Sequence, residues 1–177
     1  MRRRDMLLGA GSLGLVGGAG LFVSDRRILG TQTGVDPVSV ETLDAPGSDA
    51  GTVSAPERGT TTFLEFFATW CGTCESMMEP LSQVHSTVSN DVQFISITNE
   101  PIGQSIARDD VIEWWREHGG NWTVGLDNDL QLTDAFEVVE IPTAIVLDER
   151  NDVAWSGAGR KSTETLVDRI ESTHSEA

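Results

Sequence analysis

The sequence is poor in basic residues, and lysine is nearly absent. Its 177 residues include 12 lysines and arginines against 28 aspartates and glutamates, which gives a formal net charge of −16 at pH 7. Lys161 is the only lysine. A surface this acidic repels phosphates, and the sequence holds no basic patch of the kind that binds a nucleic-acid backbone. We therefore expect no nucleic-acid partner.

Cysteine is also scarce, since Cys71 and Cys74 are the only two. One pair excludes both a second disulfide and a four-cysteine zinc site. The histidines, His85, His118 and His174, stand at unrelated positions and offer no evident further ligands to close a zinc shell. We therefore expect no metal, and two thiols separated by two residues favour redox chemistry.

The start of the chain lacks a hydrophobic run free of glycine. Residues 6–23 are mostly apolar but contain six glycines, which would make a poor buried helix. Arg2 to Arg4 precede this segment, and Arg3-Arg4-Asp5-Met6-Leu7 fits the twin-arginine export pattern. We predict that residues 1–27 are a twin-arginine-type signal peptide or signal anchor.

The fate of this leader stays open. No Ala-x-Ala site follows it, Gly18-Ala19-Gly20 is only a weak cleavage candidate, and no cysteine is placed for a lipid anchor. The 18 residues of 6–23 approach the length that spans a bilayer, with Arg2 to Arg4 on the cytoplasmic side. Cleavage with release and an uncleaved membrane tether are both compatible with the sequence, and both place the remaining chain outside the cytoplasm.

Beyond the leader we expect a linker at 28–36, one domain at 37–172 and a flexible tail at 173–177. Without residues 1–27 the chain keeps 7 basic and 26 acidic residues, hence a formal charge of −19. At about 1 M salt the Debye length is near 3 Å, and the resulting self-repulsion is largely screened. Acidic excess together with lysine scarcity favours a halophile's protein, and the alternative is an ordinary acidic secreted domain.

One stretch, Phe63 to Cys74 (FLEFFATWCGTC), combines an apolar run with the two cysteines. The apolar run suits a buried strand, and Gly72-Thr73 suits a turn into a helix. The thiols would then lie at the first turn of that helix, where amide N–H groups and the helix dipole stabilise a thiolate. An ordinary thiol, with a pKa of about 8.5, is only a few per cent ionised at pH 7.

This segment resembles the active site of the thioredoxin superfamily. About 70 residues later, Glu140-Ile141-Pro142-Thr143 resembles its Ile-Pro-Thr motif, in which the bond before proline is cis and lies beside the disulfide. That spacing is similar to the TlpA/ResA-like branch of extracytoplasmic thiol-disulfide oxidoreductases, which residues 36–172 fit. The resemblance implies an α/β thioredoxin-like fold, with a central mixed β-sheet flanked by helices, extra N-terminal strands and a central helical insertion.

The resemblance also implies catalytic roles for three residues. Cys71 would attack a partner's disulfide and form a mixed disulfide, which Cys74 then resolves. Glu65 falls where thioredoxins carry a buried acid that exchanges a proton with the second cysteine. Its alternation with Phe63 and Phe67 favours burial, and the alternative is an outward-facing residue on a strand edge.

The expected substrate-binding residues are Trp70, Gly72, Thr73, Ile141 and Pro142. Trp70 would cover the edge of the site, and the backbone of Ile141 would pair with an extended substrate strand. A purely structural turn is the alternative role for Pro142. The chain departs from the family in one respect, because the helix proline usually follows the second cysteine by five residues and Pro80 follows Cys74 by six.

Hydrophobic patterning predicts the remaining elements. The segment 109–118 resembles the central insertion of the branch, and its neighbouring tryptophans, Trp114, Trp115 and Trp122, suit either the core or a binding surface. We predict strands at 38–43, 60–67, 91–99 and 122–126, a hairpin of 143–147 with 153–156, helices from 71 to 89, at 109–118 and from 162 to 172, a short helix or turn at 129–136, and a loop at 44–59.

The resemblance to the TlpA/ResA-like branch implies a reductant of protein disulfides, for example of apocytochrome c thiols before haem attachment. Its cofactor would be the Cys71–Cys74 disulfide alone, and its partners would be protein thiols and a membrane electron-donor thiol protein. We expect a monomer.

One alternative function is that of an oxidant that forms disulfides. Another is a copper chaperone, because Met77 and Met78 are soft ligands close to the thiols, although helix packing is their simpler role. His85 and His118 are expected at the surface.

Overall fold

The computed structural model describes residues 34–175, and the predicted leader, residues 1–27, lies outside that range. In the described part of the chain, no helix is both long and apolar enough to cross a bilayer. The family motifs and the predicted site all fall within it.

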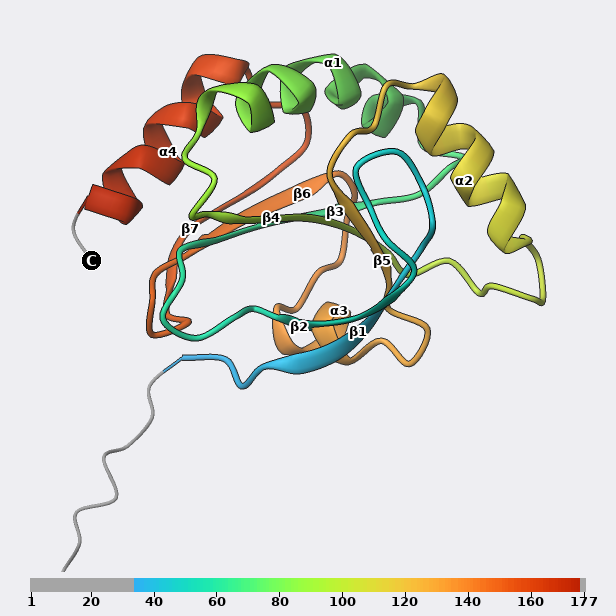
Figure 1. The fold of residues 1–177 in the computed structure, drawn as a ribbon, viewed down its shortest axis with the longest axis horizontal. Coiled ribbons are helices and arrows are strands. Elements are labelled where there is room, and N and C mark those ends of the chain that lie inside the picture. The colour runs from blue at the N-terminus through green and yellow to red at the C-terminus, as the bar shows by residue number, and fades with distance from the viewer. Residues whose placement is uncertain (1–33, 176–177) are drawn as a thin grey trace, which may run out of the picture. The chain divides into compact units, whose positions relative to one another are not determined.

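A seven-stranded mixed sheet forms the centre of the described region (Figure 1). The central strands β3, β4 and β5 run parallel, and the flanking pairs are antiparallel. The spatial order is β2-β1-β5-β4-β3-β6-β7. The strands are β1 Val38–Thr42, β2 Gly51–Ala55, β3 Thr62–Phe67, β4 Gln93–Thr98, β5 Thr123–Leu126, β6 Thr143–Leu147 and β7 Val153–Ala158.

Helices cover both faces of this sheet. The helices α1 (Gly72–Thr87), α2 (Arg108–Glu117) and α4 (Thr163–Ser175) lie on one face, and the short α3 (Gln131–Ala135) lies on the other (Figure 1). This is the arrangement that the resemblance implies, with β1 and β2 as the N-terminal strands and α2 as the insertion between β4 and β5.

Strand β3 connects the two halves of the core. All six of its residues are buried, as its apolar run predicts. Phe63 and Phe67 pack under α1 and α2, whereas Leu64 and Phe66 pack with Leu132 of α3 on the opposite face. Because successive side chains of a strand alternate between faces, this run supplies both layers.

Two boundaries differ from the predictions. The segment 44–59, expected to be a loop, contains β2, whose sequence Gly-Thr-Val-Ser-Ala has few strong strand formers. Pairing with β1 along five residues, rather than propensity, supplies its strand conformation. At the other end, α4 continues past the predicted end near Ser172 to Ser175, and Thr173 is buried, so the expected tail at 173–177 begins within the helix.

The tryptophans of the insertion serve mainly as core. Trp115 and Trp122 are fully buried and meet edge to face, with 4.8 Å between ring centroids. The Trp122 indole N–H donates to Ser96 Oγ at 2.9 Å. Trp114 is half-buried and stacks on Phe67 at 5.1 Å. These packed rings fix the insertion to the end of β3 that leads into the cysteines.

Candidate active site

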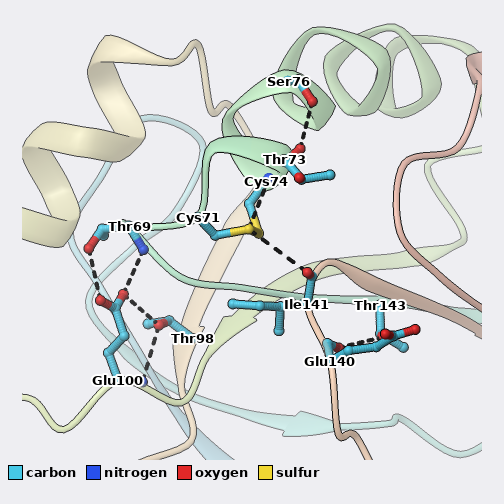
Figure 2. The surroundings of a disulfide bond; sticks show 10 residues. All are labelled: Thr69, Cys71, Thr73, Cys74, Ser76, Thr98, Glu100, Glu140, Ile141 and Thr143. Carbon is cyan, nitrogen blue, oxygen red and sulfur yellow. Dashed lines mark hydrogen bonds between the residues drawn. A yellow bond between two sulfur atoms is a disulfide. The ribbon is translucent and has the colours of Figure 1, made fainter.

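The two cysteines lie at the N-terminus of α1, as the sequence predicts. Cys71 is the N-cap residue, and it forms a disulfide with Cys74, with 5.2 Å between their Cα atoms (Figure 2). The backbone N–H of Cys74 donates to Cys71 Sγ at 3.1 Å. Cys71 is 8% exposed and Cys74 is fully buried, so Cys71 is the more accessible of the two.

A second segment, Ile141-Pro142, closes the site from the side of β6. The peptide bond between them is cis, as the resemblance implies. The carbonyl oxygen of Ile141 lies 3.9 Å from Cys71 Sγ (Figure 2), and the carbonyl oxygen of Pro142 accepts the N–H of Gly159 at 2.7 Å. The structure thus brings together two motifs that are about 70 residues apart in the sequence.

Glu65 is buried beneath this site. Its side chain is fully inaccessible, and it alternates with Phe63 and Phe67, which belong to the same core cluster as both cysteines. Within the described residues, neither of its carboxyl oxygens has a hydrogen-bond partner. Burial raises the pKa of Glu65 to about 8, and the nearby Ser96 hydroxyl on β4, which is not within hydrogen-bonding geometry, acts in the opposite direction. The carboxyl group is therefore largely protonated at neutral pH.

The rim of the site is exposed. Trp70 directly precedes Cys71 and is 74% exposed. Gly72 and Thr73 are also exposed, and a Cβ placed on Gly72 would meet no atom within 4 Å. The five residues expected to bind substrate thus border the disulfide on two sides, and their role in binding stays a prediction.

A second buried acid, Glu100, was not anticipated from the sequence. Its carboxylate accepts hydrogen bonds from the Thr69 backbone N–H and hydroxyl, both at 2.8 Å, and from the Thr98 hydroxyl at 3.0 Å (Figure 2). Thr69 precedes Cys71 by two residues, so Glu100 fixes the position of the segment that leads into Cys71. Its position after the carboxyl end of β4 was the available signal, because the parallel strands β3 and β4 end at the same edge of the sheet.

The insertion helix α2 reaches the first turn of α1. His118 stacks on Trp114 with 4.5 Å between ring centroids, and its Nε2 atom lies 3.6 Å from Glu75 Oε1. Glu75 follows Cys74 directly. His118 was expected at the surface, but its side chain is only partly exposed. Through Glu75 it contacts the helix that carries the disulfide.

The other residues considered in the sequence analysis, His85, Met77 and Met78, lie outside the candidate active site. His85 lies near the far end of α1, where it contacts the rings of Phe94 and Trp122 and lines a hollow of about 360 Å³, and burial lowers its pKa. Met77 and Met78 are buried in helix packing. Among residues 34–175, no three or more His, Cys, Asp and Glu side chains gather in a way that would hold a metal ion.

Known proteins share this sequence pattern and this fold. The sequence profile of the Redoxin family matches residues 30–172. Sporulation thiol-disulfide oxidoreductase A of Bacillus subtilis is 21% identical over 122 residues, covering 67% of this chain and 72% of the relative. Thiol-disulfide oxidoreductase ResA of the same organism is 28% identical over 111 residues, covering 62% of this chain and 59% of the relative.

Solved structures agree with these matches. The crystal structure of StoA from Bacillus subtilis superposes with a TM-score of 0.64 at 19% identity, covering 75% of this chain and 95% of that one. The structure of DsbF from Mycobacterium tuberculosis, in mixed oxidised and reduced forms, gives 0.65 at 22% identity, covering 77% and 95%. These likenesses confirm the predicted fold.

Proposed function

Because this chain belongs to the Redoxin family and is a thiol-disulfide oxidoreductase, we propose that it acts outside the cytoplasm as a reductant of protein disulfides. The observation that carries the proposal is the Cys71–Cys74 pair at the first turn of α1, in which Cys71 is 8% exposed and Cys74 is fully buried. That asymmetry supports attack by Cys71 and resolution by Cys74.

The reaction proceeds in two exchanges. The Cys71 thiolate attacks one sulfur of the substrate disulfide, forms a mixed disulfide and releases the other substrate sulfur as a thiolate, which takes up a proton. Cys74 then loses its proton and attacks Cys71 Sγ, which releases the second substrate thiol and forms the Cys71–Cys74 disulfide. Two electrons pass from the dithiol to the substrate.

Glu65 serves as the proton acceptor for Cys74 in this scheme. It lies on the face of β3 that packs under α1, and its raised pKa, about 8, is close to that of an ordinary thiol. Proton transfer between groups of similar pKa costs little free energy. A water molecule would carry the proton between the two groups.

The surroundings of Cys71 favour the reducing direction. A strong oxidant such as DsbA owes its potential to a stabilised reduced form. Here Cys71 Sγ receives one backbone N–H, from Cys74, and no cationic side chain hydrogen-bonds to it within residues 34–175. The formal charge of −19 beyond the leader also opposes an additional negative charge. A weakly stabilised thiolate keeps the dithiol reducing.

The predicted twin-arginine leader at residues 1–27 supports export, with release or a tether through residues 6–23 as the two outcomes. Outside the cytoplasm a reductant needs a source of electrons, and a membrane thiol protein that re-reduces Cys71–Cys74 fills that need. The resemblance to TlpA/ResA-like proteins implies apocytochrome c, before haem attachment, as one substrate class.

The test is the reduction potential of the Cys71–Cys74 couple, measured on the purified protein in molar salt with a defined thiol buffer. Thioredoxin lies near about −270 mV and DsbA near about −120 mV, a difference of roughly 7 kcal/mol for two electrons. A potential near the first value supports a reductant. A potential near the second makes the protein a disulfide-forming oxidant and overturns the proposed direction.

A further inference from the structure

The loop between β7 and α4 packs against the cis-proline segment. Ala158 pairs with Thr143, and the Gly159 N–H donates to the Pro142 carbonyl oxygen at 2.7 Å. The backbone N–H of Lys161 donates to Met77 Sδ at 3.1 Å. The loop is therefore fixed to both elements that form the site, the cis-proline segment and α1.

Lys161, the only lysine of the chain, holds this loop in shape. Its ammonium group donates to the carbonyl oxygens of Ala158 and Gly159. Its aliphatic stem lies close over Gly157, where an added Cβ would come within 2.7 Å of Lys161 Cε. The charge of Lys161 is thus engaged by the backbone of its own loop.

Arg160, by contrast, has a solvent-exposed guanidinium group that is not paired with an acidic side chain among the described residues. Its side chain is exposed, and within the described residues it makes no hydrogen bond or ion pair. It borders a groove of about 510 Å³ between the loop and α1, which also exposes Glu79, Gln83 and Thr163. Next to it, Gly159 leaves open space, since a Cβ there would meet nothing within 4 Å.

The charge of Arg160 stands out against the rest of the domain. Beyond residue 27 the chain carries 26 acidic and 7 basic residues, and only at Arg160-Lys161 are two basic residues adjacent. Such a domain repels an acidic partner over most of its surface. Arg160 directly follows Gly159, whose N–H is bonded to the Pro142 carbonyl oxygen, so its guanidinium gives a carboxylate one favourable position near the cis-proline segment.

We propose that Arg160 binds an Asp or Glu side chain of the substrate segment that lies along Ile141-Pro142, so that substrates with an acidic residue close to the target cysteine are preferred. The inference rests on the proposed function, because it requires a protein segment at the disulfide. A guanidinium and a carboxylate form paired, charge-assisted hydrogen bonds, which are among the stronger contacts at a partly exposed surface. Repulsion elsewhere on the domain then fixes which way the acidic side of the substrate faces.

The test uses the full-length reduced protein and peptides with one internal disulfide. The peptides place Asp, Asn or Lys at each of the two positions before and after the target cysteine, and the second-order rate constant of their reduction is measured from low to molar salt. We expect one position at which Asp is reduced roughly 10-fold faster than Lys, with Asn between them. Arg160→Gln should remove most of that difference, and Arg160→Glu should reverse it.

Arg169→Gln is the matched control, because it removes the same charge from an exposed position on α4. This variant should keep the Asp preference. If the Asp and Lys peptides react equally, or if Arg160→Gln and Arg169→Gln reduce the preference alike, the Arg160 contact is wrong while the reductase function stands. If no peptide is reduced at all, the proposed function itself fails, and this inference fails with it.

Discussion

Glu65 is a carboxyl group that its burial keeps protonated at neutral pH. In the proposed mechanism it must accept a proton from Cys74, which requires its ionised form. Raising the pH through its pKa of about 8 therefore increases the fraction of protein able to resolve a mixed disulfide. The activity should follow this titration.

We predict that Glu65→Gln slows resolution of the mixed disulfide, on the order of 100-fold, since general-base catalysis commonly contributes that much. Stopped-flow kinetics with a peptide disulfide separates attack by Cys71 from resolution by Cys74. The wild-type resolution rate should rise up to about pH 8, and this rise should be absent in the variant. Glu113→Gln, at an exposed position on α2, is the control, and identical pH profiles for Glu65→Gln and wild type would remove Glu65 from the mechanism.

The same group should make stability depend on pH. Between its unfolded pKa of 4.5 and its folded pKa of about 8, Glu65 holds its proton only in the folded state. The folded state therefore binds more protons, and this contribution to stability falls as pH rises, by at most about 1.4 kcal/mol per pH unit. Glu65→Gln lacks this loss, so its unfolding free energy relative to wild type should increase from pH 5 to pH 8. Denaturant titrations of the oxidised proteins measure the difference, and a constant difference would contradict the assigned pKa.

Glu100 is expected to act through the position of Thr69. Glu100→Ala leaves the Thr69 N–H and two threonine hydroxyls without their acceptor, and leaving a buried donor unsatisfied costs about 1–3 kcal/mol. We predict a loss of stability in that range and slower attack by Cys71. Glu100→Gln, which keeps one acceptor oxygen, should lose less. Denaturant titration measures the loss of stability, and stopped-flow kinetics measures the rate of attack by Cys71. Wild-type values of both for Glu100→Ala would show that these hydrogen bonds contribute nothing to stability or to attack.

At the scale of elements, the close approach of β5 to its neighbours depends on Gly125. A Cβ at this position would lie 2.5 Å from Val40 Cγ1 and 3.0 Å from Ile97 Cδ1, both in the core under α3. We predict that Gly125→Ala destabilises the fold by about 1–3 kcal/mol through overpacking. Gly51→Ala on β2 is the matched control, since its Cβ would meet only Thr42 Oγ1, at 3.9 Å. Equal denaturation midpoints for the two variants would contradict this packing.

The elements around the cysteines were predictable because each has a strong local signal. The apolar run of β3 and the alternation of Phe63, Glu65 and Phe67 correctly placed the strand and the buried acid. Strand β2 has no such signal, since its conformation comes from pairing with β1. Glu100 escaped prediction for a related reason, because its partner Thr69 lies 31 residues away and meets it only once β3 and β4 pair. Contacts between distant segments depend on register, which local patterns do not encode.

At the scale of the whole molecule, charge dominates the expected behaviour. The domain beyond residue 27 carries a formal charge of −19, and self-repulsion of this size opposes the compact state unless salt screens it. We predict that the thermal unfolding midpoint rises steeply between dilute buffer and molar salt. Thermal melts over a series of potassium chloride concentrations measure this rise. Full stability in dilute buffer would favour the ordinary acidic secreted domain over the halophile's protein.

The exposure of Trp70 gives the molecule an optical probe of its own beside the disulfide. Trp115 and Trp122 are buried, and Trp114 and Trp155 are partly covered, so Trp70 is the tryptophan most open to a dissolved quencher. If substrates dock on Cys71 as proposed, we expect them to cover this ring and shield its fluorescence from the quencher, without any label or change to the chain. The emission of a residue that the fold leaves outside its core would then report each encounter between this protein and a substrate.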